Sequence, residues 1–395
     1  MSTRESTLLW PAWPSYTEEQ IAAVSKVLQS GQVNYWTGEE CRLFEKEFAE
    51  FSGTAHAVAL SNGSVAIELA LKSLGIGPGD EVIVTPRSYF ATVSSIVLVG
   101  AAPIFVDVDQ FTQNITAQSI SQRISSRTKA VICVHLAGAP CDMDPILELT
   151  RKHGIRVIED CAQAHGASYK GKMVGSIGDV GTWSFCQDKI MTTGGEGGMV
   201  TTNDPDLWKA MWSHKDHGKN WETVYHGNHG PGFRWLHESF GTNWRMTEIQ
   251  GVMGRIQLKK MEAWTQQRLS NAQCIWKAAD ELPGLRSPKI VEGGGHAAYK
   301  AYVFVVNTLL KDEWTRDRIM MEIQEAGVPC LTGSCPEIYL EKAFEGTTWR
   351  PETRLPVARQ LGETSLMFQV HPTLLEKHID KVTDVLTEIM KRAVR

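Results

Sequence analysis

Short apolar runs alternate with helical periodicity between residues 55 and 160, and this alternation constrains the fold more than any other feature. The runs are rich in β-formers and nearly free of polar residues, as in parallel strands that are covered on both faces. Strands that alternate with helices predict a layered α/β domain. The expected strands are His56–Leu60, Glu81–Thr85, Ile104–Val108, Ala130–His135 and Arg156–Glu159, and the expected helices include Val65–Leu74 and Ala91–Val99.

The alternation ends after Asp160. Two strand-like runs then follow each other without a helix, so we expect a hairpin or an antiparallel strand to join the sheet. These runs are Val180–Phe185 and Met199–Thr202, and a helix is expected at Asp206–His214. Gly218–Asn243 is rich in Gly, His, Trp and Asn and is predicted to be a long functional loop, whereas Glu248–Leu269 is predicted to be one long helix.

The pattern past Pro283 is typical of a smaller α+β domain. It predicts a strand at Ala301–Asn307 and helices at Arg316–Ala326 and Lys377–Arg392. A length of 395 residues also suggests about two domains. We therefore predict a large α/β domain over residues 15–260 and a small C-terminal α+β domain over residues 261–395.

Charge and composition exclude several classes of protein. The 40 Lys and Arg residues against 45 Asp and Glu give a net charge of −5, which argues against a general nucleic-acid binder. No apolar run reaches the roughly 18 residues of a membrane span. The first residues, MSTRESTLLWPAWPS, lack the apolar core of a signal peptide, so a cytoplasmic location is expected. The eight cysteines form no CxxC pair, and no metal site is predicted.

Two clusters follow expected strands and point to a ligand. Gly63 and Ser64 open a helix after an Asn-Gly turn, where free backbone N–H groups and a hydroxyl suit a phosphate, although an ordinary helix cap has the same pattern. Asp160 ends a buried strand, at the sheet edge where open α/β proteins bind ligands; its alternative is also a helix cap. Gln163 and His165 follow within one turn and either bind a ligand or satisfy backbone groups.

Two further clusters lie beyond residue 180. Lys189 precedes a glycine-rich loop, and a desolvated lysine can act as the nucleophilic amine of Schiff-base chemistry; the alternative is a solvated surface residue. The glycine run has no following Lys-Ser/Thr, so it is not a nucleotide P-loop. Asn243 and Arg245 precede the last helix of this region and can reach a ligand or a second subunit, or else form a plain loop before a cap at Thr247.

Taken together and in this order, the clusters resemble the DegT/DnrJ/EryC1/StrS family of sugar aminotransferases, which use pyridoxal 5'-phosphate (PLP). The segments that carry the resemblance include HAVALSNGSVAIELAL, GDEVIVTPRSYFAT, VIEDCAQAHGASYKGKMVGSIGDVGTWSF, KIMTTGGEGGMVTTND and GTNWRMTEIQ. The resemblance implies the aspartate-aminotransferase-like (type I PLP) fold, with a mixed, mostly parallel sheet in the large domain. It covers nearly the whole chain.

The resemblance also implies a role for individual residues. Lys189 matches the Schiff-base lysine and Asp160 the acid that faces the pyridine nitrogen of PLP. The other implied cofactor contacts are Gln163 beside the phenolic oxygen, Tyr89 stacked on the ring, Gly63, Ser64 and Ser184 around the phosphate, and Asn243, which reaches the phosphate of a neighbouring subunit. That last contact implies a homodimer with shared active sites. Phe90, beside Tyr89, is expected in the core.

The implied reaction transfers the amino group of L-glutamate to a nucleotide-linked 4-keto-6-deoxy sugar in cell-surface glycan (lipopolysaccharide) biosynthesis. Strings such as VNYWTG and FRWLHESFGTNWRMTE resemble the branch that uses a UDP-linked 2-acetamido-4-keto sugar. Ala137, Cys186 and CLTGSC depart from the usual pattern where substrate is expected. Lys215, His217 and Arg245 are candidate contacts for the diphosphate of the acceptor.

Two alternatives use the same scaffold. A PLP-dependent nucleotide-sugar dehydratase would have histidine in place of the Schiff-base lysine, so Lys189 argues against it. A non-catalytic regulator with a PLP fold would not need the lysine, the acid and the phosphate cradle together.

Overall fold

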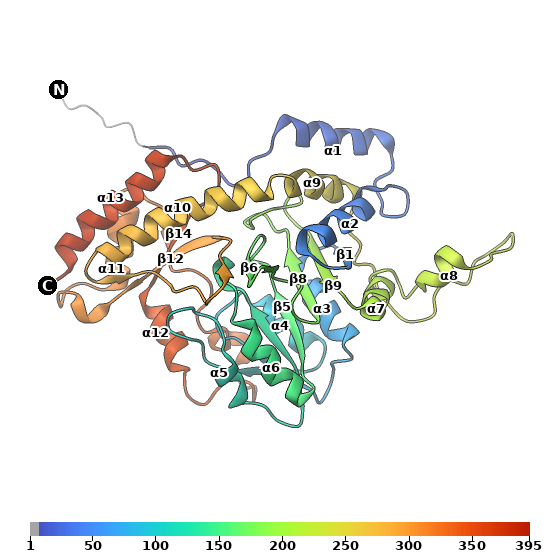
Figure 1. Ribbon diagram of the computed structural model, residues 1–395, viewed down its shortest axis with the longest axis horizontal. Helices are drawn as coiled ribbons and strands as arrows, with labels where there is room; N and C mark the ends of the chain where they lie inside the picture. The colour runs from blue at the N-terminus through green and yellow to red at the C-terminus, as the bar shows by residue number, and fades with distance from the viewer. Residues whose placement is uncertain (1–7) are drawn as a thin grey trace.

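The structure is a computed structural model and describes residues 8–395 (Figure 1). Residues 1–7 lie outside the described residues. They belong to the N-terminal segment in which no signal peptide is expected. A seven-stranded sheet at the centre has the order β1-β9-β8-β5-β4-β2-β3. Its strands are β1 (His56–Leu60), β2 (Glu81–Val84), β3 (Ala102–Phe105), β4 (Thr128–Val134), β5 (Arg156–Asp160), β8 (Val180–Ser184) and β9 (Gly198–Thr202).

The central sheet is mixed and mostly parallel, as predicted. β3, β2, β4, β5 and β8 pair in parallel, whereas β9 runs antiparallel to both β8 and β1. The pairing of β8 with β9 confirms the expected antiparallel strand. β3 begins and ends earlier than the predicted Ile104–Val108, because it pairs with β2 from Ala102 to Phe105. The buried Val106 and Val108 lie past the last paired position.

Helices cover both faces of the sheet and bury its alternating side chains. Ile158 packs with α3, α4 and α7 on one face, whereas Val157 packs with α6 and Trp183 with α2 on the other. Asp160 therefore shares the face of Ile158, and Glu159 shares the face of Val157. These helices are α2 (Glu40–Ser52), α3 (Gly63–Ser73), α4 (Ala91–Leu98), α6 (Met143–His153) and α7 (Pro205–Lys215); α5 (Ala117–Ser121) lies beside α6.

A second, antiparallel sheet lies in the C-terminal part of the chain, with the order β10-β12-β14-β13. Its strands are β10 (Leu285–Arg286), β12 (Lys300–Val305), β13 (Cys330–Leu331) and β14 (Ser365–Gln369). A separate apolar core joins it to α10 (Met261–Glu281), α11 (Arg316–Glu325) and α13 (Glu376–Ala393). The smaller elements are β6 (Ser168–Tyr169), β7 (Lys172–Met173), β11 (Gly294–Gly295) and α12 (Pro356–Thr364). A domain boundary at residue 260 stays a prediction.

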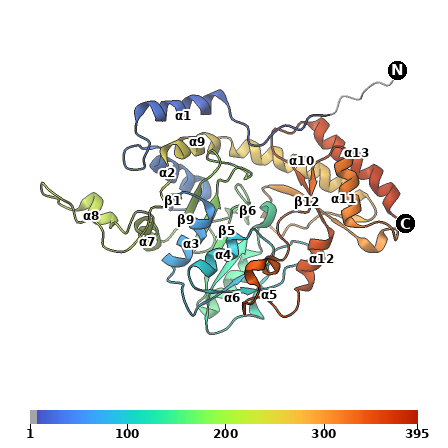
Figure 2. The same cartoon turned by 180° about the vertical axis from the view of Figure 1, so that it is seen from behind.

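Two predicted segments differ from the structure. The single helix expected over Glu248–Leu269 is wrong, because α9 (Glu248–Leu258) ends and α10 begins at Met261 after a break at Lys259 and Lys260. The expected loop over Gly218–Asn243 contains a short helix, α8 (Trp221–His226), capped by the side chain of Asn220. Both views show that α8 and the loop after it project away from the rest of the chain, whereas α1 (Glu18–Ser30) lies along α9 (Figures 1 and 2).

None of the helices in residues 8–395 has the length and apolar character needed to cross a membrane.

Candidate active site

A cavity of about 610 Å³ opens at the carboxyl ends of β1, β5 and β8, beside α3 and α4. Ligands bind at this edge of open α/β sheets. Seven of the eight predicted cofactor residues line it: Gly63, Ser64, Tyr89, Asp160, Gln163, Ser184 and Lys189. Asn243 does not line the cavity of its own chain. The residues that the sequence spreads over about 125 positions are thus brought to one place by the sheet.

The start of α3 forms one end of the cavity. The side chain of Asn62 caps the helix by accepting a hydrogen bond from the Val65 N–H at 3.0 Å. Gly63 and Ser64 are the first residues of the helix, so their N–H groups have no carbonyl partner within it. A Cβ atom at Gly63 would lie 2.6 Å from Cβ of Ser184, so only glycine allows the helix to approach β8 this closely. Free amides and two hydroxyls at a helix N-terminus suit a phosphate.

Asp160 lies at the buried wall of the cavity. Its carboxylate accepts hydrogen bonds from the Thr92 hydroxyl at 2.8 Å and from the Ala162 N–H at 3.1 Å. Burial raises the pKa of Asp160, and these two bonds together with the charge of Lys189 act in the opposite direction. An acid in this setting is suited to hold a cationic ring nitrogen, because a buried carboxylate needs a charged or hydrogen-bonded partner.

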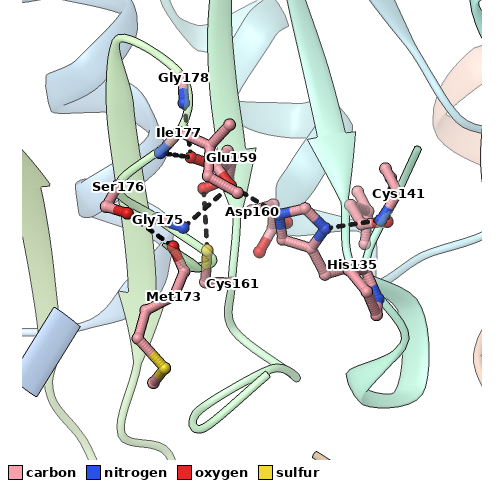
Figure 3. A network of polar contacts seen from close by, with 12 residues as sticks. His135, Cys141, Glu159, Asp160, Cys161, Met173, Gly175, Ser176, Ile177 and Gly178 are labelled. Carbon is pink, nitrogen blue, oxygen red and sulfur yellow. Dashed lines mark hydrogen bonds and ion pairs between the residues drawn. The ribbon is translucent and has the colours of Figure 1, made fainter. Parts of the chain in front are cut away.

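Glu159, on the opposite face of β5, is buried in a dense polar network (Figure 3). Its oxygens accept four N–H bonds, from His135 Nε2 and from the backbone of Gly175, Ile177 and Gly178, at 2.7–2.9 Å. Burial alone would raise the pKa of Glu159, but His135 and the amides of Gly175 and Gly178 lower it below its usual value. The network holds the end of the strand that carries Asp160.

Three potential metal ligands, His135, Glu159 and Cys161, come together in this network. Their atoms are already engaged, however. Nδ1 of His135 accepts a hydrogen bond from the Cys141 N–H at 3.0 Å, so Nε2 carries the proton that Glu159 accepts. The contacts therefore describe a hydrogen-bonded neutral histidine that needs no ion.

Gln163 is held in place from two sides. Its Oε1 accepts a hydrogen bond from the Ala137 N–H at 2.9 Å, and its Nε2 donates to Ser334 Oγ at 3.4 Å. Ala137 has a left-handed φ of 56°, a conformation that costs energy for a residue with a side chain. This strained turn directs its amide N–H at Gln163. Position 137, where the sequence departs from the usual pattern of the family, therefore contacts a predicted cofactor residue. His165, by contrast, is buried between aromatic rings, and neither ring nitrogen has a hydrogen-bond partner among residues 8–395.

Lys189 extends into the cavity from the loop after β8. Its side chain is mostly buried, with Nζ 3.9 Å from a carboxylate oxygen of Asp188 and 5.3 Å from the ring centre of Tyr299. The Tyr299 hydroxyl donates a hydrogen bond to Asp188. Burial alone would raise the pKa of Asp188, but Lys189 and Tyr299 lower it, so Asp188 provides a negative charge beside the lysine. The alternative that Lys189 is a solvated surface residue is wrong.

Tyr89 and Phe90 differ as the sequence predicts. Tyr89 is 68% exposed at the mouth of the cavity, where its ring is free to stack on a ligand. Phe90 is partly buried and packs edge-on against Phe344, 6.2 Å between ring centres.

The predicted acceptor contacts lie outside the cavity. The prediction for Lys215 is wrong, because its amine is fully buried, 3.4 Å from Glu45 and 3.7 Å from the ring centre of Tyr35. Arg245 forms an ion pair with Asp216 at 2.7 Å, which connects the residue after α7 to the loop before α9. His217 is exposed. Contacts of Arg245 and His217 with substrate stay predictions.

Sequence reasoning missed four residues of this region. Thr92 lies in the segment GDEVIVTPRSYFAT, and no local pattern indicates its contact with Asp160, which is 68 residues away in sequence. Asp188 is adjacent to Lys189 in sequence. Tyr299 and Lys300 lie more than 100 residues beyond Lys189, at the start of β12 in the second sheet. No local pattern indicates that they come close to Asp188 and Lys189.

Comparison with known proteins agrees with this site. The model of the DegT/DnrJ/EryC1/StrS aminotransferase family matches residues 14–387. GDP-perosamine synthase of Caulobacter vibrioides is 36% identical over 357 residues, with 88% of this chain and 89% of the relative covered. UDP-N-acetyl-3-dehydro-α-D-glucosamine 3-aminotransferase of Acidithiobacillus ferrooxidans is 35% identical, with 93% of each chain covered. A crystal structure of an aminotransferase from Psychrobacter cryohalolentis has a TM-score of 0.95 and 57% identity, with 97% of this chain and 99% of that chain covered.

The fold and the site define an aminotransferase of the type I PLP class, and the chain belongs to the DegT/DnrJ/EryC1/StrS aminotransferase family. It is a PLP-dependent sugar aminotransferase. The residues present fit the cofactor: an anion cradle that a Cβ at Gly63 would fill, a buried acid and a lysine line one cavity. The predictions of family, fold class, enzyme class and cofactor are thereby confirmed.

Proposed function

We propose that the protein transfers the amino group of L-glutamate to a nucleotide-linked 4-keto-6-deoxy sugar, with a UDP-linked 2-acetamido-4-keto sugar as the first candidate. The observation that carries the proposal is the single cavity lined by Lys189, Asp160 and the start of α3. By their names, one of the two relatives described above makes a GDP-linked sugar and the other acts on a UDP-linked sugar, so they support the nucleotide-sugar class. The product would serve cell-surface glycan synthesis in the cytoplasm.

Within this proposal each cofactor contact has a defined task. PLP, when bound, acts as an electron sink that makes a proton next to the amine removable. Gly63, Ser64 and Ser184 would hold its phosphate, and Asp160 would keep the pyridine nitrogen protonated. Tyr89 would stack on the ring and Gln163 would lie beside the phenolic oxygen. Two amides at a helix start and two hydroxyls meet the demands of a phosphate dianion.

Lys189 would bind the cofactor covalently and then move the proton. Nζ of Lys189 would act as general base and general acid on the proton next to the donor amine. The neighbouring carboxylate of Asp188, held by Tyr299, lies 3.9 Å from this amine.

A homodimer with shared sites is part of the proposal. We name residues 221–240, which comprise α8 and the loop after it, the projecting arm. Phe233, Trp235 and Phe240 on this arm are 78%, 85% and 100% exposed, an arrangement that suits contact with a second copy. Asn243 follows the arm, is exposed and does not line the cavity of its own chain. This placement suits a residue that contacts the cofactor phosphate in the site of a second copy. His217 and Arg245 flank the arm and would meet the nucleotide portion of the acceptor.

The test is a panel of UDP-, GDP- and dTDP-linked keto sugars, each incubated with the purified holoenzyme and L-glutamate. Mass spectrometry should find one amino sugar, with 2-oxoglutarate formed in equal amount. The Lys189→Ala protein is the control and should form neither. Formation instead of a deoxygenated keto sugar without a new amine, with the nitrogen of glutamate released as ammonia beside 2-oxoglutarate, would support the dehydratase alternative, and no reaction with any member of the panel would support a non-catalytic role.

A further inference from the structure

Positive charge accumulates around Tyr299, on the side of Lys189 that faces the second sheet. Nζ of Lys300 lies 4.9 Å from the centre of the Tyr299 ring, and Nζ of Lys189 lies 5.3 Å from the same centre. The guanidinium of Arg268, in α10, donates a long hydrogen bond of 3.5 Å to the Tyr299 carbonyl. Three cations therefore surround one tyrosine.

The described residues do not neutralise this charge. Nε and Nη2 of Arg268 are buried and have no hydrogen-bond partner among residues 8–395. The one carboxylate that acts on Lys300 within the described chain is Asp188, which already contacts Lys189 and Tyr299. Burial, followed by Arg268, lowers the pKa of Lys300 to about 8, and burial lowers that of Arg268 to about 9. An anion at this place would relieve the repulsion.

The anion has to be one that arrives with the reaction. The phosphate cradle at Gly63 and Ser64 and the acid Asp160 line the cavity, so the cofactor phosphate does not reach this cluster under the proposed function. Lys300 and Arg268 are not among the lining residues; their cluster adjoins the cavity through Tyr299, which contacts Lys189 and Asp188 of the lining. An amino-acid donor must bring its amine to Lys189, and its carboxylate groups then lie within a few bonds of that amine. Unpaired cations beside the lysine are placed to receive them.

We propose that Lys300, supported by the buried guanidinium of Arg268, binds a carboxylate of the amino-acid donor and thereby selects the donor. This inference rests on the proposed function, because it assumes that an amino acid reacts at Lys189. It adds a donor-binding residue from the second sheet, more than 100 residues from the lysine in sequence. The guanidinium of Arg268 lies over the ring of Trp13, 4.7 Å from its centre. Arg268 acts as a positioning residue, because this contact holds its positive charge beside Lys300.

The test is the single-turnover reaction of the holoenzyme with L-glutamate, followed by the loss of the visible absorption of the cofactor. Rates at increasing glutamate concentration give the half-saturating concentration and the maximal rate. Lys300→Met should raise the half-saturating concentration about tenfold or more, as expected for a lost hydrogen bond between charged groups, and change the maximal rate less than threefold. Lys300→Arg should recover most of the affinity, and the exposed Lys381→Met is the matched control.

The outcomes separate this inference from the proposed function. If the unaltered holoenzyme does not respond to glutamate, the proposed donor is wrong. If it responds and Lys300→Met leaves the half-saturating concentration within twofold, the inference is overturned. A loss of UDP binding in place of glutamate binding would assign the cluster to the acceptor and would also overturn it. Lys300→Gln serves as the second neutral variant if Lys300→Met does not fold.

Discussion

Replacement of Glu159 by glutamine is expected to destabilise the protein by about 4 kcal/mol. The substitution keeps the shape but turns one of two buried acceptor oxygens into a donor. If the new amide nitrogen faces Ile177 and Gly178, two backbone N–H groups lose their acceptor. If it faces the other side, Gly175 loses its acceptor and His135 must change tautomer, which leaves the Cys141 N–H unpaired.

Either orientation leaves two buried donors without a partner, and each costs roughly 1–3 kcal/mol. The free energy of unfolding is measured by urea denaturation of the cofactor-free protein, so that ligand binding does not contribute. Glu148→Gln is the control, because Glu148 is exposed, pairs with Lys152 one helical turn away, and should change stability by less than about 0.5 kcal/mol. A loss below 1 kcal/mol for Glu159→Gln would refute the account of this network.

Four further predictions concern the site and the assembly. Asp160→Asn should still bind PLP but slow the glutamate reaction by about 100-fold or more in stopped-flow absorbance, because the ring nitrogen loses its anionic partner. Inactive Lys189→Ala and Asn243→Asp proteins should regain activity when mixed after subunit exchange, since hybrid dimers contain one intact site. Initial rates against both substrates should give parallel double-reciprocal lines, as expected when the amine is stored on the enzyme. The pKa of Glu159 is lowered in the folded protein, so the ionised carboxylate contributes fully to stability above the usual carboxylate pKa. This contribution is lost as the pH falls through the lower pKa of the folded state. In acid denaturation, the Glu159→Gln protein should not show this part of the stability loss.

The part of the site that the sequence predicts is the part built on the central sheet. Asp160 and Ser184 each end an apolar strand, and the carboxyl ends of parallel strands meet at one edge, so their proximity follows from the pattern. Glu159 was not assigned a role, although it is the polar residue inside an apolar strand. Its partners come from a turn and from the neighbouring strand, which no local spacing reveals.

The errors have equally specific causes. Apolar residues keep helical spacing across Lys259 and Lys260, and no Gly or Pro marks the break between α9 and α10. The helix α8 is six residues long, too short for its periodicity to stand out from the aromatic-rich segment around it. Lys215 seemed free because a lysine usually faces water, but α7 turns it towards Glu45 and the ring of Tyr35 on the buried side.

The visible absorption of the purified protein tests the central claim most directly. The account predicts that the protein carries a cofactor band in the visible range, that L-glutamate removes this band, and that 2-oxoglutarate restores it. Lys189→Ala should bind PLP without this response, because the amine that bonds to the cofactor and moves the proton is missing. A band that glutamate leaves unchanged, or a Lys189→Ala protein that responds as the unaltered protein does, would contradict the assignment of Lys189 and with it the proposed amino transfer.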